Sequence, residues 1–400
     1  MDNMKKSICF PEGFLASGIS CGIKKGKKKD LALVFSTYPC ISSAVFTTNK
    51  VKSYSVIWSI KNIKNPIQAI LANSGNANAA CGKKGWDITT KIMEHLSLIL
   101  NISSKNILFA STGLIGNPLP EKTIINSLEK IVKNLSYKNG IEAAESIITT
   151  DKQIKTEEIT TSIAGIKKGG FVKLGAMAKG AGMINPNMAT MLAFITTDAV
   201  ISKELLQIAL QKAVNDSFNM ITIDNDQSTN DTVFCLANGQ AGNKNIKENS
   251  EEFYIFSKAL RDVCISLAKK IAKDGEGAKK FIEVSVFDAW SKKDAKRIAK
   301  KVAGSSLVKT AIAGAWSNWG RIMSSIGSAR AKIEPANIKL EIGPYIVYNK
   351  EPIKFNDSEL KQYLSEKEIS IKIYISKGKE NATAWGCDLT EEYIKINKKE

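Results

Sequence analysis

Short segments rich in Val, Ile and aromatic residues alternate along this chain with longer segments whose apolar residues recur every three to four positions. The first pattern is typical of strands and the second of amphipathic helices. A chain that mixes the two must stack helices on β-sheets, so the sequence predicts an α+β or layered α/β fold. Strands are expected at 30–36, 44–48, 54–60, 67–72, 106–110, 159–163, 191–195, 232–236, 281–287 and 369–375, and helices at 87–100, 120–135, 203–215, 253–272 and 292–302.

The length of 400 residues exceeds what one hydrophobic core usually serves, although no long Pro/Gly/Ser linker marks a boundary. With 44% hydrophobic and 24% charged residues, the composition is that of a folded protein rather than a disordered one. No apolar run approaches the length of a membrane span, and the first 14 residues lack the apolar core of a secretory signal. We therefore expect a cytoplasmic protein.

The formal net charge of +18 raises the question of nucleic-acid binding. Only four of the basic residues are arginine, whose planar fork is the preferred group for reading bases and phosphates. The lysines are spread along the chain, and the densest run, Lys24–Lys29, has no aromatic neighbours. A solvated lysine-rich surface is favoured, and a lysine-rich nucleic-acid-binding or purely structural protein is the less favoured alternative outside enzymes.

Cysteine and histidine usage restricts the chemistry further. The seven cysteines are widely spaced and form no C-x-x-C pair, so neither a disulfide framework nor a zinc cage is predicted. The single histidine, His95, falls in a segment with helical periodicity, where a packed or exposed helix residue is the simplest interpretation. No metal site is predicted, and a nucleophilic enzyme with this sequence needs a base other than histidine.

A glycine-rich stretch over 165–187 is followed abruptly by the apolar run Met188–Ile195. The stretch lacks the Gly-Lys-Ser/Thr ending of a phosphate-binding P-loop. A calcium loop starting at Asp224 is also excluded, because Thr229 and Cys235 stand where glycine and glutamate are needed. An Asx-rich turn is the better interpretation of 224–231.

Two threonines remain as candidates for chemistry. Thr190 begins the strand-like apolar run, and Thr112 lies where a predicted strand passes into the glycine-containing turn 110–116. A hydroxyl and backbone N–H groups in such a turn are able to stabilise an oxyanion. An ordinary strand start is the favoured explanation of Thr190, and an ordinary strand-to-loop turn explains Thr112 equally well, so spacing alone assigns neither a catalytic role.

Nearly the whole chain resembles the ornithine acetyltransferases (glutamate N-acetyltransferases) of arginine biosynthesis, which are self-cleaving enzymes with an N-terminal threonine. The resemblance rests on many short segments in the expected order, which together are highly specific. These segments are Asp30–Val34, Ala72–Asn78, Ser111–Gly113, Thr149–Asp151, Ala178–Met183, Asn187–Leu192, Ser228–Thr232, Asp274–Ala278, Leu307–Ala311 and Asn318–Ile322.

The resemblance implies that the precursor cuts itself between Ala189 and Thr190. The products would be an N-terminal chain, 1–189, and a C-terminal chain, 190–400, that begins with the nucleophile. The implied fold is a layered α-β-β-α sandwich of the N-terminal-nucleophile type. The freed α-amine of Thr190, with a reference pKa of roughly 8, would serve as general base, which removes the need for histidine.

The resemblance also implies a reaction and a set of site residues. Thr190 would take the acetyl group from N-acetyl-L-ornithine, release ornithine and pass the acetyl group to L-glutamate. No cofactor is implied, and the motifs leave open whether acetyl-CoA is also a donor. Two copies of each cleaved chain are expected to form a heterotetramer. Thr112 and Gly113 match the oxyanion hole, and the matches to substrate-contacting positions are Thr149, Lys179, Thr190, Glu276 and Asn397.

The sequence departs from the family pattern in three places. The sequence ends at Glu400 without the family's terminal Thr or Ser, so that substrate contact is expected to be absent or replaced. Trp316-Ser317 stands where Asp-Pro is usual, and Asn225 replaces a frequent glycine, which is a mild change because Asn tolerates left-handed backbone.

A related self-cleaving aminopeptidase, which would hydrolyse its acyl-enzyme with water, is the alternative enzyme. The matches at Lys179 and Glu276 favour the transferase.

Overall fold

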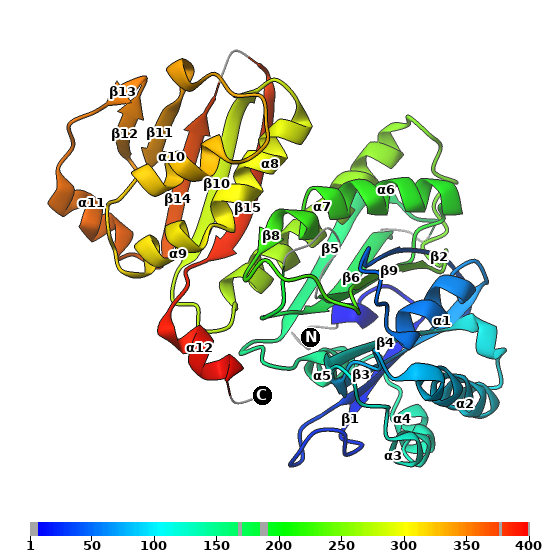
Figure 1. Ribbon diagram of the computed structural model, residues 1–400. Helices are drawn as coiled ribbons and strands as arrows, with labels where there is room; N and C mark the ends of the chain where they lie inside the picture. The colour runs from blue at the N-terminus through cyan, green and yellow to red at the C-terminus, as the bar shows by residue number, and fades with distance from the viewer. Residues whose placement is uncertain (1–6, 167–169, 185–190, 376–377, 399–400) are drawn as a thin grey trace. The chain divides into compact units, whose positions relative to one another are not determined.

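The computed structural model describes residues 7–166, 170–184, 191–375 and 378–398 (Figure 1). The chain divides into two units, each with its own β-sheet and its own helices. The first unit comprises the described residues of Met1–Gly180, Asn187–Asn219 and Gln227–Leu267, and the second those of Ala181–Pro186, Met220–Asp226 and Ala268–Glu400. The predicted mixed α/β class is therefore confirmed.

The sheet of the first unit runs in the order β4-β3-β2-β9-β7-β6-β5, and β1 pairs with β2 outside this path. Neighbouring strands are antiparallel except for the parallel pairs β3–β4 and β7–β9. The strands are β1 (Phe14–Ile19), β2 (Leu31–Phe46), β3 (Ile67–Asn76), β4 (Ile107–Leu114), β5 (Lys155–Ala164), β6 (Phe171–Lys179), β7 (Leu192–Thr197) and β9 (Thr232–Ala237).

The long strand β2 divides this sheet into two halves. It pairs with β3 through Leu31–Cys40 and with β9 through Ile41–Phe46. One buried apolar cluster contains Val34 and Ile70 from the first half together with Phe194 and Phe234 from the second. The two phenylalanine rings stack at 5.6 Å. The halves therefore face each other across a shared core.

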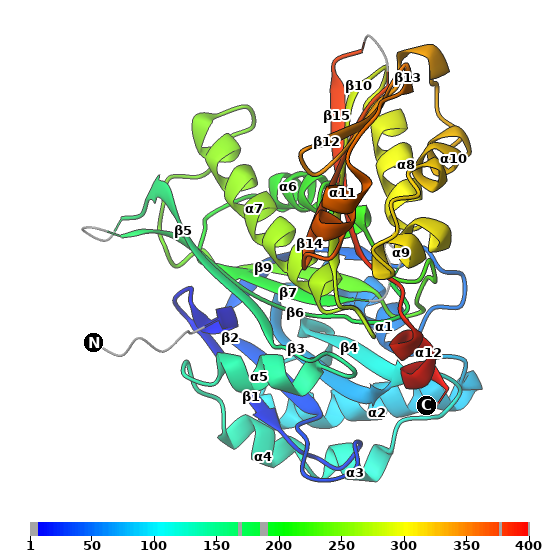
Figure 2. The ribbon, with the colours of Figure 1, turned by 90° about the vertical axis from the view of Figure 1, so that its left-hand side faces the viewer.

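Helices cover the outer faces of both halves (Figure 2). Alternation along the strands sends Leu33 and Leu71 away from the shared core into a second apolar cluster, where α2 supplies Ile92 and Leu96. Helices α1 to α4 lie on that side, whereas α6 and α7 lie on the outer side of β9, β7 and β6. The first unit thus has the α-β-β-α layering that the resemblance implies. Its helices are α1 (Tyr54–Asn62), α2 (Gly82–Leu100), α3 (Glu121–Ile125), α4 (Leu128–Lys133), α5 (Gly140–Ile147), α6 (Lys203–Asn215) and α7 (Glu251–Lys273), the last of which ends in the second unit.

The second unit has a sheet in the order β13-β12-β11-β14-β10-β15-β8. Strand β10 is parallel to β14, and β8 is parallel to β15. Helix α8 packs on β10 and β15. Its buried residues Ala295, Ile298, Ala299 and Val302 recur at helical spacing, and Ser291 caps its N-terminus. The elements are β8 (Ile221–Thr222), β10 (Phe281–Ala289), β11 (Lys339–Ile342), β12 (Tyr345–Asn349), β13 (Glu351–Pro352), β14 (Glu368–Tyr374), β15 (Glu380–Cys387), α8 (Lys292–Ala303), α9 (Ser306–Ala313), α10 (Gly320–Gly327), α11 (Asp357–Leu364) and α12 (Glu391–Asn397).

Two predicted elements are wrong, and the two strands predicted at 30–36 and 44–48 are one continuous strand, β2. Residues 54–60 form helix α1 instead of a strand: Ser53 caps the helix, and buried Trp58 donates from Nε1 to the carbonyl of Ile107 at 2.9 Å. The small and apolar residues of this segment fit the spacing of a strand or of a helix equally well. Packing against β4 selects the helix. The single helix expected over 120–135 is two short helices, because the chain turns at Asn126 between α3 and α4.

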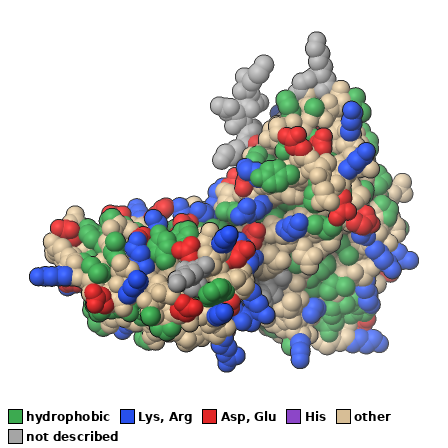
Figure 3. Space-filling model, turned by 90° about the horizontal axis from the view of Figure 1, so that it is seen from above, with side chains coloured by type: hydrophobic (Ala, Val, Ile, Leu, Met, Phe, Trp, Pro, Cys, Tyr) green, Lys and Arg blue, Asp and Glu red, His purple; other side chains and the backbone are tan. Residues whose placement is uncertain are grey.

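The predicted helix 203–215 is confirmed without change as α6. Its N-cap Ser202 accepts a hydrogen bond from the amide of Leu205 at 3.2 Å. Within the described residues, none of the helices combines the length and apolar character needed to cross a membrane. On the face shown in Figure 3, lysine and arginine side chains are interspersed with aspartate and glutamate. That face agrees with a solvated lysine-rich surface.

Candidate active site

The C-terminal end of β4 carries the predicted oxyanion pair, Thr112 and Gly113. Strand β4 pairs with β3 in parallel, and the register shifts where Gly75 and Asn76 oppose this pair. Gly113 has φ +135°, and a Cβ atom there would lie 2.3 Å from the carbonyl carbon of Gly75. Only glycine fits this close backbone contact without strain. The β3–β4 irregularity therefore requires glycine next to Thr112.

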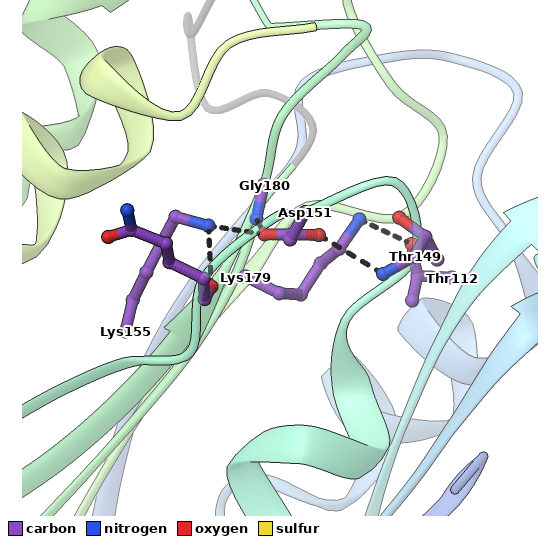
Figure 4. A network of polar contacts seen from close by, with 7 residues as sticks. Thr112, Thr149, Asp151, Lys155, Lys179 and Gly180 are labelled. Carbon is purple, nitrogen blue, oxygen red and sulfur yellow. Dashed lines mark hydrogen bonds and ion pairs between the residues drawn. The ribbon is translucent and has the colours of Figure 1, made fainter. Parts of the chain in front are cut away.

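Lys179, the last residue of β6, points at Thr112 (Figure 4). Its Nζ atom donates to the Oγ1 atom of Thr112 at 3.2 Å, and both residues are buried. A threonine hydroxyl has one donor and two acceptor positions. When the ammonium occupies an acceptor position, the Thr112 O–H stays available as a donor to a negative oxygen. This pair suits stabilisation of an oxyanion or binding of a carboxylate.

Asp151 connects Thr149, another predicted substrate-contacting residue of the first unit, to the backbone next to Lys179. One carboxylate oxygen accepts from Lys155 Nζ at 2.6 Å and from the Gly180 amide at 2.7 Å. The other accepts from the Thr149 amide at 3.1 Å. Burial raises the pKa of Asp151, but the positive charges of Lys179 and Lys155 and these hydrogen bonds outweigh burial and lower that pKa to about 2.

Lys24 adds a further cation close to Thr149. Its Nζ atom donates to the carbonyl of Ile148 at 2.6 Å and to that of Lys29 at 3.0 Å. Burial lowers the pKa of Lys24 to about 8, and the nearby charge of Lys179 contributes to this decrease. The prediction of a solvated run over 24–29 thus holds for the exposed residues 25–28, whereas Lys24 is partly buried.

Two residues of the Ser228–Thr232 segment hold backbone around the cluster. Asn230 donates from Nδ2 to the carbonyls of Ala77 at 2.6 Å and Ser111 at 2.8 Å, which fixes the peptide before Thr112. Asp231 accepts from the amide of Met191 at 2.7 Å, and burial raises its pKa well above the ordinary value. Sequence reasoning assigned no role to Asp151, Asn230 or Asp231. The only signal for them was their place inside segments that carry the resemblance.

The second unit brings Glu276 and Asn397 together. The Nδ2 atom of Asn397, at the end of α12, donates to Glu276 Oε2 at 2.9 Å. The Glu276 amide donates to the carbonyl of Ala181 at 2.8 Å, and a Cβ atom at Gly182 would collide with the Glu276 carboxylate. Glu276 is buried, whereas Asn397 is exposed. The absence of a side chain at Gly182 thus leaves room for the Glu276 carboxylate.

The predicted Asx-rich turn over 224–231 follows β8 and binds the backbone near the end of the glycine-rich stretch over 165–187. Asp224 accepts from the amides of Met183 at 2.5 Å and Ile184 at 2.8 Å. Burial raises the pKa of Asp224, which these amide hydrogen bonds lower in part. Asn225 has φ +66°. This is the left-handed backbone conformation that Asn tolerates in place of the family's frequent glycine, as expected from the sequence.

The remaining predicted site residues, Ala189 and Thr190, lie outside the described residues, so the cleavage site and the nucleophile stay predictions. The described chain resumes at Met191, directly before β7. His95 is an exposed residue of α2, as the simplest interpretation held, and its Nδ1 atom lies 2.8 Å from the carbonyl oxygen of Lys91.

The fold and this cluster define a layered α/β protein in which a buried lysine and a threonine hydroxyl meet at a strand end, an arrangement suited to acyl transfer. The profile of the ArgJ family matches residues 15–399. The chain belongs to the ArgJ family, which confirms the resemblance inferred from the short segments.

Relatives and a solved structure agree with this assignment. The arginine biosynthesis bifunctional protein ArgJ of Dehalococcoides mccartyi is 46% identical over 395 residues, covering 98% of this chain and 96% of that protein. The protein of the same name from Caldanaerobacter subterraneus is 42% identical over 407 residues, covering 99% of each. The crystal structure of arginine biosynthesis bifunctional protein ArgJ from Bacillus halodurans is 43% identical, with a TM-score of 0.51, and covers 53% of this chain and 100% of that one.

Proposed function

We propose that this chain is an acetyltransferase of arginine biosynthesis that moves an acetyl group from N-acetyl-L-ornithine to L-glutamate through an acetyl-Thr190 intermediate. The observation that carries the proposal is the buried contact between Lys179 and Thr112 beside Gly113, in a chain of the ArgJ family. The names of the relatives, which describe bifunctional proteins of arginine biosynthesis, support the enzyme class.

Self-cleavage between Ala189 and Thr190 would prepare the nucleophile. Attack of the Thr190 hydroxyl on the preceding carbonyl converts an amide into an ester, and hydrolysis of the ester frees the α-amine. The C-terminal product, 190–400, is slightly more than half of the chain. The Bacillus halodurans chain is covered completely and matches 53% of this one, a share that agrees with a fragment of that size.

In the cleaved protein the α-amine of Thr190 acts as general base for its own hydroxyl. Attack on the acetyl carbonyl creates a tetrahedral oxyanion, to which the Thr112 hydroxyl and the Gly113 amide donate. The ammonium of Lys179 polarises the Thr112 hydroxyl through the 3.2 Å contact and adds positive charge at a buried position. The existing contact between Lys179 and Thr112 supports a preorganised site, which would need little reorganisation during the reaction.

The proposed substrate-binding residues fall into one set that suits a negatively charged group and another that suits a positively charged group. Lys179 and Thr149 suit the carboxylate that both amino-acid substrates carry, and Glu276 suits an ammonium group. Asn397 donates from Nδ2 to the Glu276 carboxylate at 2.9 Å and to the carbonyl of Tyr393 at 3.0 Å, so its Oδ1 atom is the group it offers to the substrate. We further propose that two copies of each cleaved chain form a heterotetramer in the cytoplasm. Acetyl-CoA as a second donor to glutamate would account for the word bifunctional in the names of the relatives.

The decisive experiment follows the acetyl group. N-acetylornithine alone should add about 42 Da to the peptide that begins at Thr190 and release an equal amount of ornithine. Glutamate added afterwards should remove the label as N-acetylglutamate, and water should do so only slowly. Intersecting double-reciprocal plots, or no adduct after rapid quenching, would contradict the proposed covalent route.

The same experiment separates the alternatives. An aminopeptidase would lose its acyl group to water at the same rate with or without glutamate. A lysine-rich binding protein would stay one uncut chain and bind polyanions with a steep dependence on salt. Replacing N-acetylornithine by acetyl-CoA tests the second donor, and native mass spectrometry tests the heterotetramer.

A further inference from the structure

Asp151 is the point at which three polar hydrogens from different parts of the first unit meet (Figure 4). Its carboxylate accepts from Lys155 Nζ at 2.6 Å, from the Gly180 amide at 2.7 Å and from the Thr149 amide at 3.1 Å. The Asp151 and Lys155 side chains are 0% and 1% exposed. A charged pair at this depth is expensive to desolvate, so its presence calls for an explanation beyond stability.

The partners of Asp151 explain its position. Thr149 and Asp151 belong to the loop between α5 and β5, whereas Gly180 directly follows Lys179 at the end of β6. One rigid carboxylate thus ties the backbone of the loop to the backbone next to Lys179. Strands β5 and β6 pair here with Lys155 opposite Ala178, so the Lys155 ammonium reaches the same carboxylate from the adjoining strand.

We infer that Asp151, with Lys155 as its counter-ion, is a positioning residue that fixes the spacing between Thr149 and Lys179 on the side of the site that takes the substrate carboxylate. The inference rests on the proposed function, because the family resemblance is what assigns these two residues to the substrate. Asp151 itself does not contact the reacting atoms in this scheme. It acts through the two backbone amides that it holds.

The Asp151→Asn variant probes this role with little change in shape. Asparagine keeps one oxygen for Lys155 and the Gly180 amide, but its NH₂ group faces the Thr149 amide, so two donors oppose each other. The loop contact is lost while the strand contact is kept. Displacements of about 1 Å in a positioned site cost on the order of a hundredfold in rate.

The sharp measurement compares two donors, N-acetylornithine and its α-carboxamide, which lacks the negative charge. The cleaved parent enzyme should prefer the carboxylate in kcat/KM by about a hundredfold, the range expected for a charge-assisted contact. In Asp151→Asn the preference should fall to about tenfold or less, mainly through KM for the carboxylate donor. A merely structural defect would lower kcat/KM for both donors equally and leave the preference unchanged.

The matched control is the pair Lys258 and Asp262, which has the same four-residue spacing and an Nζ–Oδ2 distance of 3.0 Å but is exposed on α7. Asp262→Asn should leave the preference at its parental value. If Asp151→Asn does not fold, the double variant Asp151→Asn/Lys155→Met removes both buried charges and should show the same reduced preference.

The outcomes distinguish a failure of the positioning role from a failure of the proposed function. A parent enzyme that transfers acetyl and prefers the carboxylate, together with an Asp151→Asn variant that keeps the full preference, overturns the positioning role alone. A parent enzyme that forms no acetyl adduct overturns the proposed function. A reduced preference in Asp151→Asn, with the control unchanged, supports the positioning role.

Discussion

The two units present site residues in contrasting settings. In the first unit, Thr112 and Lys179 are buried at strand ends and Asp151 is buried in the loop before β5, and hydrogen bonds from several elements hold them. In the second, Asn397 is an exposed residue at the end of α12, a helix of seven residues, and it reaches Glu276 through one side-chain hydrogen bond. In the proposed roles, the buried contacts of the first unit would preorganise it for charge development, whereas the exposed Asn397 beside the buried Glu276 of the second unit would allow substrate recognition to adjust.

The largest effect is expected from removing the hydroxyl of Thr190, the proposed nucleophile. Thr190→Ala should abolish self-cleavage, because no hydroxyl remains to attack the carbonyl of Ala189. Mass spectrometry should find one intact chain in the variant and fragments ending at Ala189 and beginning at Thr190 in the parent. A parent chain that stays uncut and still transfers acetyl groups would contradict the proposed N-terminal base.

The next effect tests the preorganised unit. Thr112→Ala removes an oxyanion donor, which typically costs about 3 to 4 kcal/mol, or roughly a hundredfold to a thousandfold in kcat. KM should change little, because the donor acts on charge that develops in the transition state. Steady-state kinetics on fully cleaved protein provide the test. An unchanged kcat would refute the role of this hydroxyl.

A smaller effect follows from the ionised Asp151. Its pKa of about 2 in the folded protein lies below the ordinary 3.8, so ionisation stabilises the fold above pH 4 and this contribution is lost as the pH falls toward 2. The shift corresponds to about 2 kcal/mol. Urea unfolding at pH 7 and pH 3 should show a steeper loss for the parent than for Asp151→Asn. Equal losses would mean that Asp151 is not the titrating group.

The smallest effect is expected in the second unit. Asn397→Ala removes one exposed amide that supports Glu276, so KM for the donor should rise by about tenfold or less while kcat stays within about twofold. Initial rates over a range of N-acetylornithine concentrations measure both. A loss in kcat as large as that of Thr112→Ala would overturn the contrast between the two units.

Several features of the fold were predictable from local patterns. The apolar spacing in 203–215 identified α6, and Ser202 supplied its cap. The residue pattern predicted the wrong element for 54–60, because its Ser and apolar residues fit the spacing of both a strand and a helix. Contact with β4 favours the helix. Local patterns also missed the break at Asn126, because the periodicity continues through the turn that separates α3 from α4.

The candidate site was predictable only as far as the resemblance reached. Thr112, Lys179 and Glu276 were named from matched segments and Asn397 from its correspondence to a family position near the C-terminus, and the structure brings each into the contacts described. Asp151 had no such assignment, because a carboxylate that binds distant amides leaves no periodic trace in a sequence. Its role depends on three donors that approach from separate elements.

By itself the sequence determined the mixed α/β class, the family and the identity of the residues that carry charge and hydroxyl groups. These follow from side-chain chemistry and short-range spacing, which are properties of neighbours along the chain. Only the tertiary structure decided that Lys179 meets Thr112 and that Gly113 must lack a side chain. Those facts depend on contacts between residues far apart in sequence, and such contacts arise only when the β-sheet brings the strand ends together.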